Sequence, residues 1–283
     1  MEGRVVAAHG RQYVVELPDG VLLPCFPRGK RSDVACGDRV DLERTSDDQG
    51  VIEAIQPRTS LLYRSNVVRQ KLIAANVDQI VIVVATEPAF SDELVTRALL
   101  AAESEEIEPL IVLNKCDLSD RVADARARLA VFAALGYRIV ELSARDHAED
   151  LRPELYGYTS VLVGQSGMGK STLVNALVPE AGAATREISA ALDSGKHTTT
   201  HATLYHLDAG SDLIDSPGLQ EFGLGHLDRQ EIEHAFREFR PFLGQCRFRD
   251  CRHGREPDCA LTAAVAAGRI DARRFALYHR IVG

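Results

Sequence analysis

The sequence contains no long apolar segment. No run of apolar residues approaches the roughly 20 that are needed to span a bilayer, so we expect no membrane attachment. The first residues, Met1–Arg4, lack the charged and apolar pattern of an export signal. We therefore expect a cytoplasmic protein, in which the six cysteines stay reduced and form no disulfides.

A net positive charge is also lacking, because the formal net charge is −8 at neutral pH. This argues against a protein that is basic over its whole surface, although local basic patches decide nucleic-acid binding more directly than the total charge does. The 283 residues, 45% of them apolar, can form one large domain or two to three small ones with real cores.

Residues 1–57 have the pattern of a small all-β domain. Five short strands separated by Gly, Asp and Pro turns predict a closed β-barrel of the OB type, a fold that often binds RNA or DNA. The loop Arg28–Arg31 carries three cations, and it is equally compatible with a phosphate-binding surface and with a solvated charged loop. The expected strands begin at Arg4, Gln12, Gly20, Arg39 and Gly50.

A second domain is expected over residues 58–226. Residues 58–76 have no strong periodicity and are expected to form a connector. From Val77 onward, apolar strands alternate with helices, which predicts an α/β fold around a parallel sheet. The expected strands are Val77–Ala85, Pro109–Asn114 and Tyr137–Leu142, with helices over Asp92–Glu106 and Ala123–Leu135 and a hairpin over residues 202–215.

A phosphate-binding motif follows the apolar residues Val161–Val163. The spacing, the strand before it and the helix after it are those of a P-loop, in which glycines let backbone N–H groups face phosphate oxygens. Lys170 should reach the β- and γ-phosphates, and the Ser171 hydroxyl should ligate Mg²⁺. The nucleotide-binding residues expected here are Gly164, Gln165, Ser166, Gly167, Met168, Gly169, Lys170, Ser171 and Thr172.

The pattern Asn114-Lys115-x-Asp117 stands where an expected strand ends, and it indicates that the base is guanine. The Asp117 carboxylate can accept hydrogen bonds from the ring N–H and the exocyclic amine of guanine, a pair of donors that adenine lacks. Lys115 can lie along the base, and Asn114 can brace the loop. Ser143 and Ala144 close the next strand, where a backbone N–H could meet the guanine oxygen.

Two further segments are expected to sense the γ-phosphate and Mg²⁺. In the segment Asp215–Gly218, Asp215 would hold the Mg²⁺ shell and the Gly218 N–H would contact the γ-phosphate. A threonine of residues 198–200 would complete the Mg²⁺ coordination, and we choose Thr199.

The motifs occur in an order that predicts a circularly permuted GTPase domain. The guanine-reading segments come before the P-loop, whereas in a Ras-like GTPase they come last. Permutation is physically feasible because the termini of a domain usually lie close together. The permuted chain then joins the γ-phosphate-sensing segment Asp215–Gly218, the second of the two switch segments, to the C-terminal domain, and it joins the barrel to Val77. The nucleotide state could therefore pull on both flanking domains.

Residues 227–283 are expected to form a helical zinc-binding domain. Three thiolates and one imidazole within fourteen residues suit a closed, tetrahedral, structural Zn²⁺ site, and a subdomain this small needs such a metal to fold. The expected ligands are Cys246, Cys251, His253 and Cys259. Arginines crowd this region against far fewer acids, which favours a polyanion such as RNA as a partner.

Taken together and in order, the barrel, these nucleotide motifs and the Cys/Cys/His/Cys cluster resemble the bacterial ribosome small-subunit-dependent GTPase family along essentially the whole chain. The resemblance implies a GTPase of late 30S maturation that binds ribosomal RNA near the decoding region and leaves upon GTP hydrolysis. It also implies hydrolysis stimulated by the 30S particle. The implied partners are GTP or GDP and the 30S subunit, and we expect a monomer.

His197 is the expected catalytic residue. Ras-like enzymes orient the attacking water with a glutamine just after the Asp-x-x-Gly motif, but Leu219 stands there and cannot bind water. His197 adjoins the Mg²⁺-binding threonines, and the family resemblance also points to it. Gln220 is a weaker candidate for the same role, and the alternative for His197 is a solvent-exposed histidine without a catalytic role.

For the function of the whole protein, the first alternative is a GTP-gated RNA-binding protein with a non-ribosomal target. A metal-dependent nuclease built on the zinc domain and an ATPase are less favoured.

Overall fold

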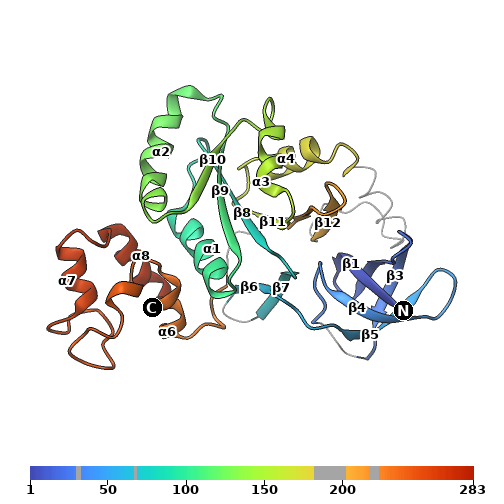
Figure 1. The fold of residues 1–283 in the computed structure, drawn as a ribbon, viewed down its shortest axis with the longest axis horizontal. Helices are drawn as coiled ribbons and strands as arrows, with labels where there is room; N and C mark the ends of the chain where they lie inside the picture. The colour runs from blue at the N-terminus through green and yellow to red at the C-terminus, as the bar shows by residue number, and fades with distance from the viewer. Residues whose placement is uncertain (30–32, 67–68, 182–201, 217–222) are drawn as a thin grey trace.

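The computed structural model describes residues 1–29, 33–66, 69–181, 202–216 and 223–283. An N-terminal barrel and a C-terminal helical module lie on either side of a central α/β domain (Figure 1). Within the described residues, no helix has both the length and the apolar character that crossing a membrane requires.

The N-terminal barrel closes as expected. Its strands pair in the order β1-β2-β3-β5-β4, and β4 pairs back onto β1. Alternate side chains point inward, so Tyr13, Cys25 and Ile52 are buried in one apolar core, where Cys25 serves as a small hydrophobic residue. The strands are β1 Glu2–His9, β2 Gln12–Glu16, β3 Leu22–Pro27, β4 Arg39–Arg44 and β5 Gly50–Ile55.

The central domain has the predicted parallel sheet, in the order β10-β9-β8-β11-β13, with β12 antiparallel at its end. Strand β8 is buried along its whole length, which explains its continuous apolar sequence. The strands are β8 Gln79–Ala85, β9 Glu108–Asn114, β10 Arg138–Glu141, β11 Thr159–Val163, β12 Thr203–His206 and β13 Asp212–Asp215. The helices are α1 Asp92–Ser104, α2 Ser119–Ala134, η1 Ala148–Leu151, α3 Arg152–Leu155 and α4 Lys170–Leu177.

The connector contains a β-hairpin that the sequence pattern did not reveal. Strands β6 Leu61–Asn66 and β7 Arg69–Ala75 form a separate two-stranded sheet. The register shifts between Leu62 and Tyr63, and such an irregularity breaks the two-residue alternation by which a strand is recognised.

The barrel and the central sheet are continuous, because β1 also pairs with β12 at Ala7 and Thr203. The two domains therefore share a backbone ladder and are not joined by the connector alone.

The C-terminal module packs on α1 through α6, which ends at Ala235 because Phe236 adopts an extended backbone. Phe236, Phe239 and Tyr278 are buried and in ring contact, so these two phenylalanines are core residues and cannot stack on bases. The elements are α6 Arg229–Ala235, η2 Arg240–Phe242, α7 Ala260–Ala266 and α8 Ala272–Val282.

A buried arginine joins this module to the central domain through a hydrogen bond, and it is held in place by an ion pair within the module. Arg274 donates to Glu238 Oε1 at 2.7 Å and to Thr96 Oγ1 on α1 at 2.9 Å. The side chains of Arg274 and Glu238 are only 1% and 3% exposed, so neither charge has water as an alternative partner.

We predict that Arg274→Ala lowers the free energy of unfolding by about 3–5 kcal/mol, because it leaves the Glu238 carboxylate buried without its partner. The matched control is Arg273→Ala, next to it but 61% exposed at its side chain, for which a change within about 0.5 kcal/mol is expected. Urea unfolding followed by circular dichroism measures the free energy of unfolding of both variants. Equal losses of stability in the two variants would contradict the role given to the buried Arg274.

Candidate nucleotide and metal sites

One cavity of about 600 Å³ collects side chains from the loops that follow β9, β10, β11 and β13. The carboxyl ends of parallel strands meet at one edge of the sheet, which is why segments far apart in sequence converge here. Of the predicted residues, the cavity is lined by Asn114, Lys115, Asp117, Ser143, Ala144, Ser166, Gly167, Gly169, Lys170, Ser171, Thr172 and Asp215.

Glycine is required at two positions of the loop between β11 and α4. Gly164 has φ +147°, and a Cβ there would lie 2.2 Å from the Val83 carbonyl oxygen. Gly169 has φ +95°, and its Cβ would lie 2.2 Å from Asn114 Nδ2. The loop therefore keeps its curved path only with glycines at both positions.

The Asn114 side chain joins the three loops that line the cavity. Its Nδ2 donates to the Met168 carbonyl at 2.8 Å, and its Oδ1 accepts from the N–H groups of Lys115 at 2.8 Å and Ala144 at 2.9 Å. Asn114 is 1% exposed, so these bonds are shielded from water. The Ala144 N–H, expected near the guanine oxygen, is used in this contact.

Lys115 lines the cavity, and its side chain is held at both ends. Its Nζ donates to the carbonyl oxygens of Glu87 and Gly167, each at 2.7 Å. Both ends of the side chain are thereby held, and its methylene stem offers a flat apolar edge. Asp117 is exposed beside it and lines the same cavity.

Lys170 and Asp215 are buried, oppositely charged side chains in the lining of the cavity. Lys170 Nζ donates to the carbonyl oxygens of Gly164 at 2.5 Å and Gln165 at 2.9 Å. Burial lowers the pKa of Lys170, and the nearby Asp215 opposes that shift; burial raises the pKa of Asp215, and Lys170 opposes it. An anion in the loop would stabilise the ammonium form and replace these carbonyl contacts.

Some predicted residues lie elsewhere. The Gln165 side chain accepts from the Ser91 N–H at 2.7 Å, outside the cavity lining, and Met168 is buried in the core. His197, Thr199 and Gly218 fall outside the described residues. Leu118 and Arg145 line the cavity and were missed, although each directly follows a recognised motif.

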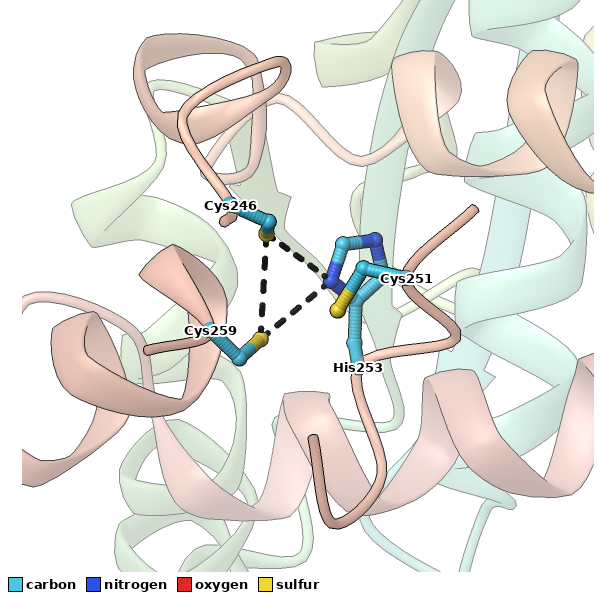
Figure 2. Close-up of side chains that lie close together, drawn as sticks. All are labelled: Cys246, Cys251, His253 and Cys259. Carbon is cyan, nitrogen blue, oxygen red and sulfur yellow. Dashed lines mark hydrogen bonds between the residues drawn. The ribbon is translucent and has the colours of Figure 1, made fainter. Parts of the chain in front are cut away.

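The Cys/His cluster forms a second site. The ligand atoms of Cys246, Cys251, His253 and Cys259 lie within 4.8 Å of one another. His253 Nδ1 is 3.5 Å from Cys246 Sγ and 3.3 Å from Cys259 Sγ, so the sulfurs and the ring nitrogen face a common centre (Figure 2). Three sulfurs and one nitrogen at this spacing could hold a metal ion tetrahedrally.

The surroundings of the cluster orient its ligands. His253 Nε2 lies 3.5 Å from Glu233 Oε1, which accepts the Tyr278 hydroxyl at 2.6 Å. With Nε2 occupied by a carboxylate, Nδ1 is left to face the metal, an arrangement common for metal-binding histidines. The N–H groups of Ala260 and Thr262 donate to two of the sulfurs and stabilise thiolates.

We predict that the protein holds one metal ion per chain. The Cys259→Ser variant should lose this ion upon dialysis against a chelator and should have a lower melting temperature, because a closed site needs all four of its ligands. Cys116→Ser is the control, since Cys116 lies outside the cluster. The metal content of each variant is measured after dialysis. Equal metal content in the two variants would refute the assignment of the metal site to this cluster.

The RsgA GTPase family model matches residues 55–225. The small ribosomal subunit biogenesis GTPase RsgA of Burkholderia pseudomallei is 58% identical over 286 aligned residues, which cover 99% of this chain and 91% of the relative. The crystal structure of YjeQ from Thermotoga maritima superposes with a TM-score of 0.74 at 32% identity, over 99% of this chain and 96% of that one. The structure of YloQ, a circularly permuted GTPase, gives a TM-score of 0.70 at 28% identity, over 99% and 93%.

Proposed function

This chain belongs to the RsgA GTPase family, and we propose that it hydrolyses GTP to GDP and phosphate as a late maturation factor of the 30S ribosomal subunit. The observation that carries the proposal is that Asp117, Lys170 and Ser171 line one and the same cavity. A guanine base and a phosphate chain are the two parts of one ligand that these groups suit. Fold class and circular permutation agree with the solved relatives.

Guanine recognition is assigned to Asp117, with the base lying along the Lys115 stem. A purine without two adjacent donors would leave the carboxylate unpaired, which explains a preference for GTP over ATP.

We assign Mg²⁺ to Ser171 and Thr199, with Asp215 in the outer shell, and a structural Zn²⁺ to the Cys/His cluster. Both Ser171 and Asp215 line the phosphate end of the cavity. Mg²⁺ would neutralise charge that develops on the phosphates, while the thiolate-rich cluster is the donor set that zinc prefers.

His197 is proposed to position or deprotonate the attacking water, since Leu219 cannot. Intrinsic turnover is then slow until a partner stimulates it.

The proposed partner is the 30S subunit and its RNA, bound in the GTP state and released after hydrolysis by a monomeric, cytoplasmic protein. Support comes from exposed cations on both flanking modules, such as Arg44 on the barrel and Arg249 in the C-terminal module. In the C-terminal module, Phe248 is 42% exposed with the Arg247 guanidinium 5.5 Å from its ring centre, a pair able to stack on an unpaired base.

We predict that Asp117→Asn weakens GTP binding by about 100-fold and strengthens binding of xanthosine triphosphate, because an amide can donate to the xanthine oxygen that replaces the guanine amine. Asp124→Asn, an exposed aspartate on α2, should change neither affinity. Competition titrations with a fluorescent guanine nucleotide measure both, and unaltered base preference in Asp117→Asn would exclude this role.

The function is tested by turnover with purified 30S subunits against bare RNA, alongside nucleotide-dependent co-sedimentation. Stimulation by subunits alone supports the proposal, whereas equal stimulation by bare RNA supports a GTP-gated RNA-binding protein with another target.

His197→Ala should lower stimulated turnover by about 100-fold or more with GTP affinity preserved. The control is His234→Ala, an exposed histidine on α6, and full stimulated turnover in His197→Ala would exclude the catalytic role.

A further inference from the structure

Strand β1 of the barrel contacts both strands that border the expected switch segments. Ala8 N–H donates to the Ala202 carbonyl at 3.4 Å, and Ala7 pairs with Thr203. Ala202 and Thr203 directly follow residues 182–201, and β12 pairs with β13, which ends at Asp215. The barrel thus adjoins the end of one switch and the strand leading to the other.

Arg4 of β1 also connects the starts of the two strands that carry the phosphate-site residues. Its Nη1 donates to Asp212 Oδ2 at 2.5 Å, and its Nη2 donates to Thr159 Oγ1 at 3.2 Å. Thr159 is the first residue of β11, which leads into Gly164, and Asp212 is the first residue of β13. The two are direct register partners.

A displacement of Arg4 would therefore act on both strands at once. Strands rise about 3.3 Å per residue, so Asp212 and Asp215 lie about 10 Å apart along a stiff, buried ladder. Moving the start of such a strand moves its end, because close-packed cores do not absorb shifts gradually.

A histidine strengthens the same contact. His206 Nδ1 lies 2.7 Å from Asp212 Oδ1, and its Nε2 lies 2.8 Å from Glu16 Oε2 on β2. The hydrogen bond to Asp212, together with the Glu16 contacts, raises the pKa of His206 to about 9, so it is cationic at neutral pH. Arg4 and His206 thus hold the Asp212 carboxylate between two cations.

Among the residues that the structure describes, the C-terminal module makes no comparable side-chain contact with β11 or β13. Its buried contact runs through Arg274 to Thr96 on α1, and its surface pairs join Arg237 and Arg240 to Glu103 at the end of α1. Helix α1 carries none of the nucleotide motifs. Of the two modules, the barrel is the one whose described side chains bond directly to the strands that lead to Gly164 and Asp215.

We propose that Arg4 is a positioning residue for GTP hydrolysis: when a polyanionic partner binds the barrel, Arg4 transmits the resulting shift to β11 and β13 and sets Asp215 for catalysis. The inference rests on the proposed function in one respect, namely that the barrel contacts the 30S subunit. It predicts an effect on the rate of the stimulated step and not on attachment to the subunit.

The test compares Arg4→Ala, Arg4→Lys and the control Arg11→Ala, an exposed arginine in the turn after β1. In Arg4→Ala, we expect the subunit-stimulated kcat to fall about tenfold while the half-saturating subunit concentration stays unchanged. Arg4→Lys should fall between the wild type and Arg4→Ala, because lysine keeps the ion pair with Asp212 but lacks the fork that also reaches Thr159. Arg11→Ala should keep the wild-type kcat. A higher half-saturating concentration with normal kcat in Arg4→Ala would overturn the proposal, since Arg4 would then serve binding only.

A second measurement does not depend on the subunit. A double-mutant cycle with Arg4→Ala and Asp212→Asn reads the ratio of affinities for GDP and a non-hydrolysable GTP analogue. Each single variant should change this ratio about threefold, and the double variant by clearly less than the product of the two changes, since both break the contact between Arg4 and Asp212. Additive effects, or no effect, would overturn the coupling. If 30S subunits do not stimulate turnover by the wild-type protein, the proposed function fails. The double-mutant cycle would still test the role of Arg4, because it does not use the subunit.

Discussion

The nucleotide site depends on the hydrogen bonds of one buried amide. Asn114 ties the guanine-reading loop to the P-loop and to the segment Ser143–Ala144 through three bonds of 2.8–2.9 Å. A buried amide that loses one such bond has no water to replace it, so the three loops hold one another in place. Permutation leaves this contact intact, because it depends on where the strands end in space and not on their order in the chain. The same amide explains why Gly169 cannot carry a side chain.

The two flanking modules are attached to the central domain by different kinds of contact. The sequence suggested that nucleotide state could pull on both of them through their chain connections. The barrel is attached through a shared backbone ladder and the partly exposed charges of Arg4 and His206, whereas the C-terminal module is held by a fully buried arginine against α1. Breaking the hydrogen bond from the buried Arg274 to Thr96 would leave buried polar groups unsatisfied, whereas contacts at a partly exposed edge rearrange more cheaply. The barrel is therefore the module suited to move with the nucleotide state.

The parts that could be predicted from sequence are those whose chemistry is local. The P-loop, Asn114–Asp117 and the Cys/His cluster are short segments in which spacing alone fixes which groups face a ligand, and the parallel sheet follows from apolar strands such as β8. The hairpin β6–β7 escaped notice because a register shift breaks its alternation. The contacts of Arg4 and Arg274 join residues 208 and 178 positions apart, and no local pattern encodes a partner at that distance.

The arginine count of the C-terminal module overstates the charge it can offer to RNA. Arg274 is buried against Glu238, Arg237 and Arg240 pair with Glu103, and the guanidinium of Arg269 lies 4.6 Å from the Phe242 ring centre. These side chains fill the interface with α1 or cover the module's own core. The exposed residues Arg249, Arg252 and Arg255 lie in the loop that contributes Cys251 and His253. On the proposed function, a polyanion that binds this module would meet cations in the loop that carries two of the candidate metal ligands, so metal occupancy and RNA contact would be physically linked there.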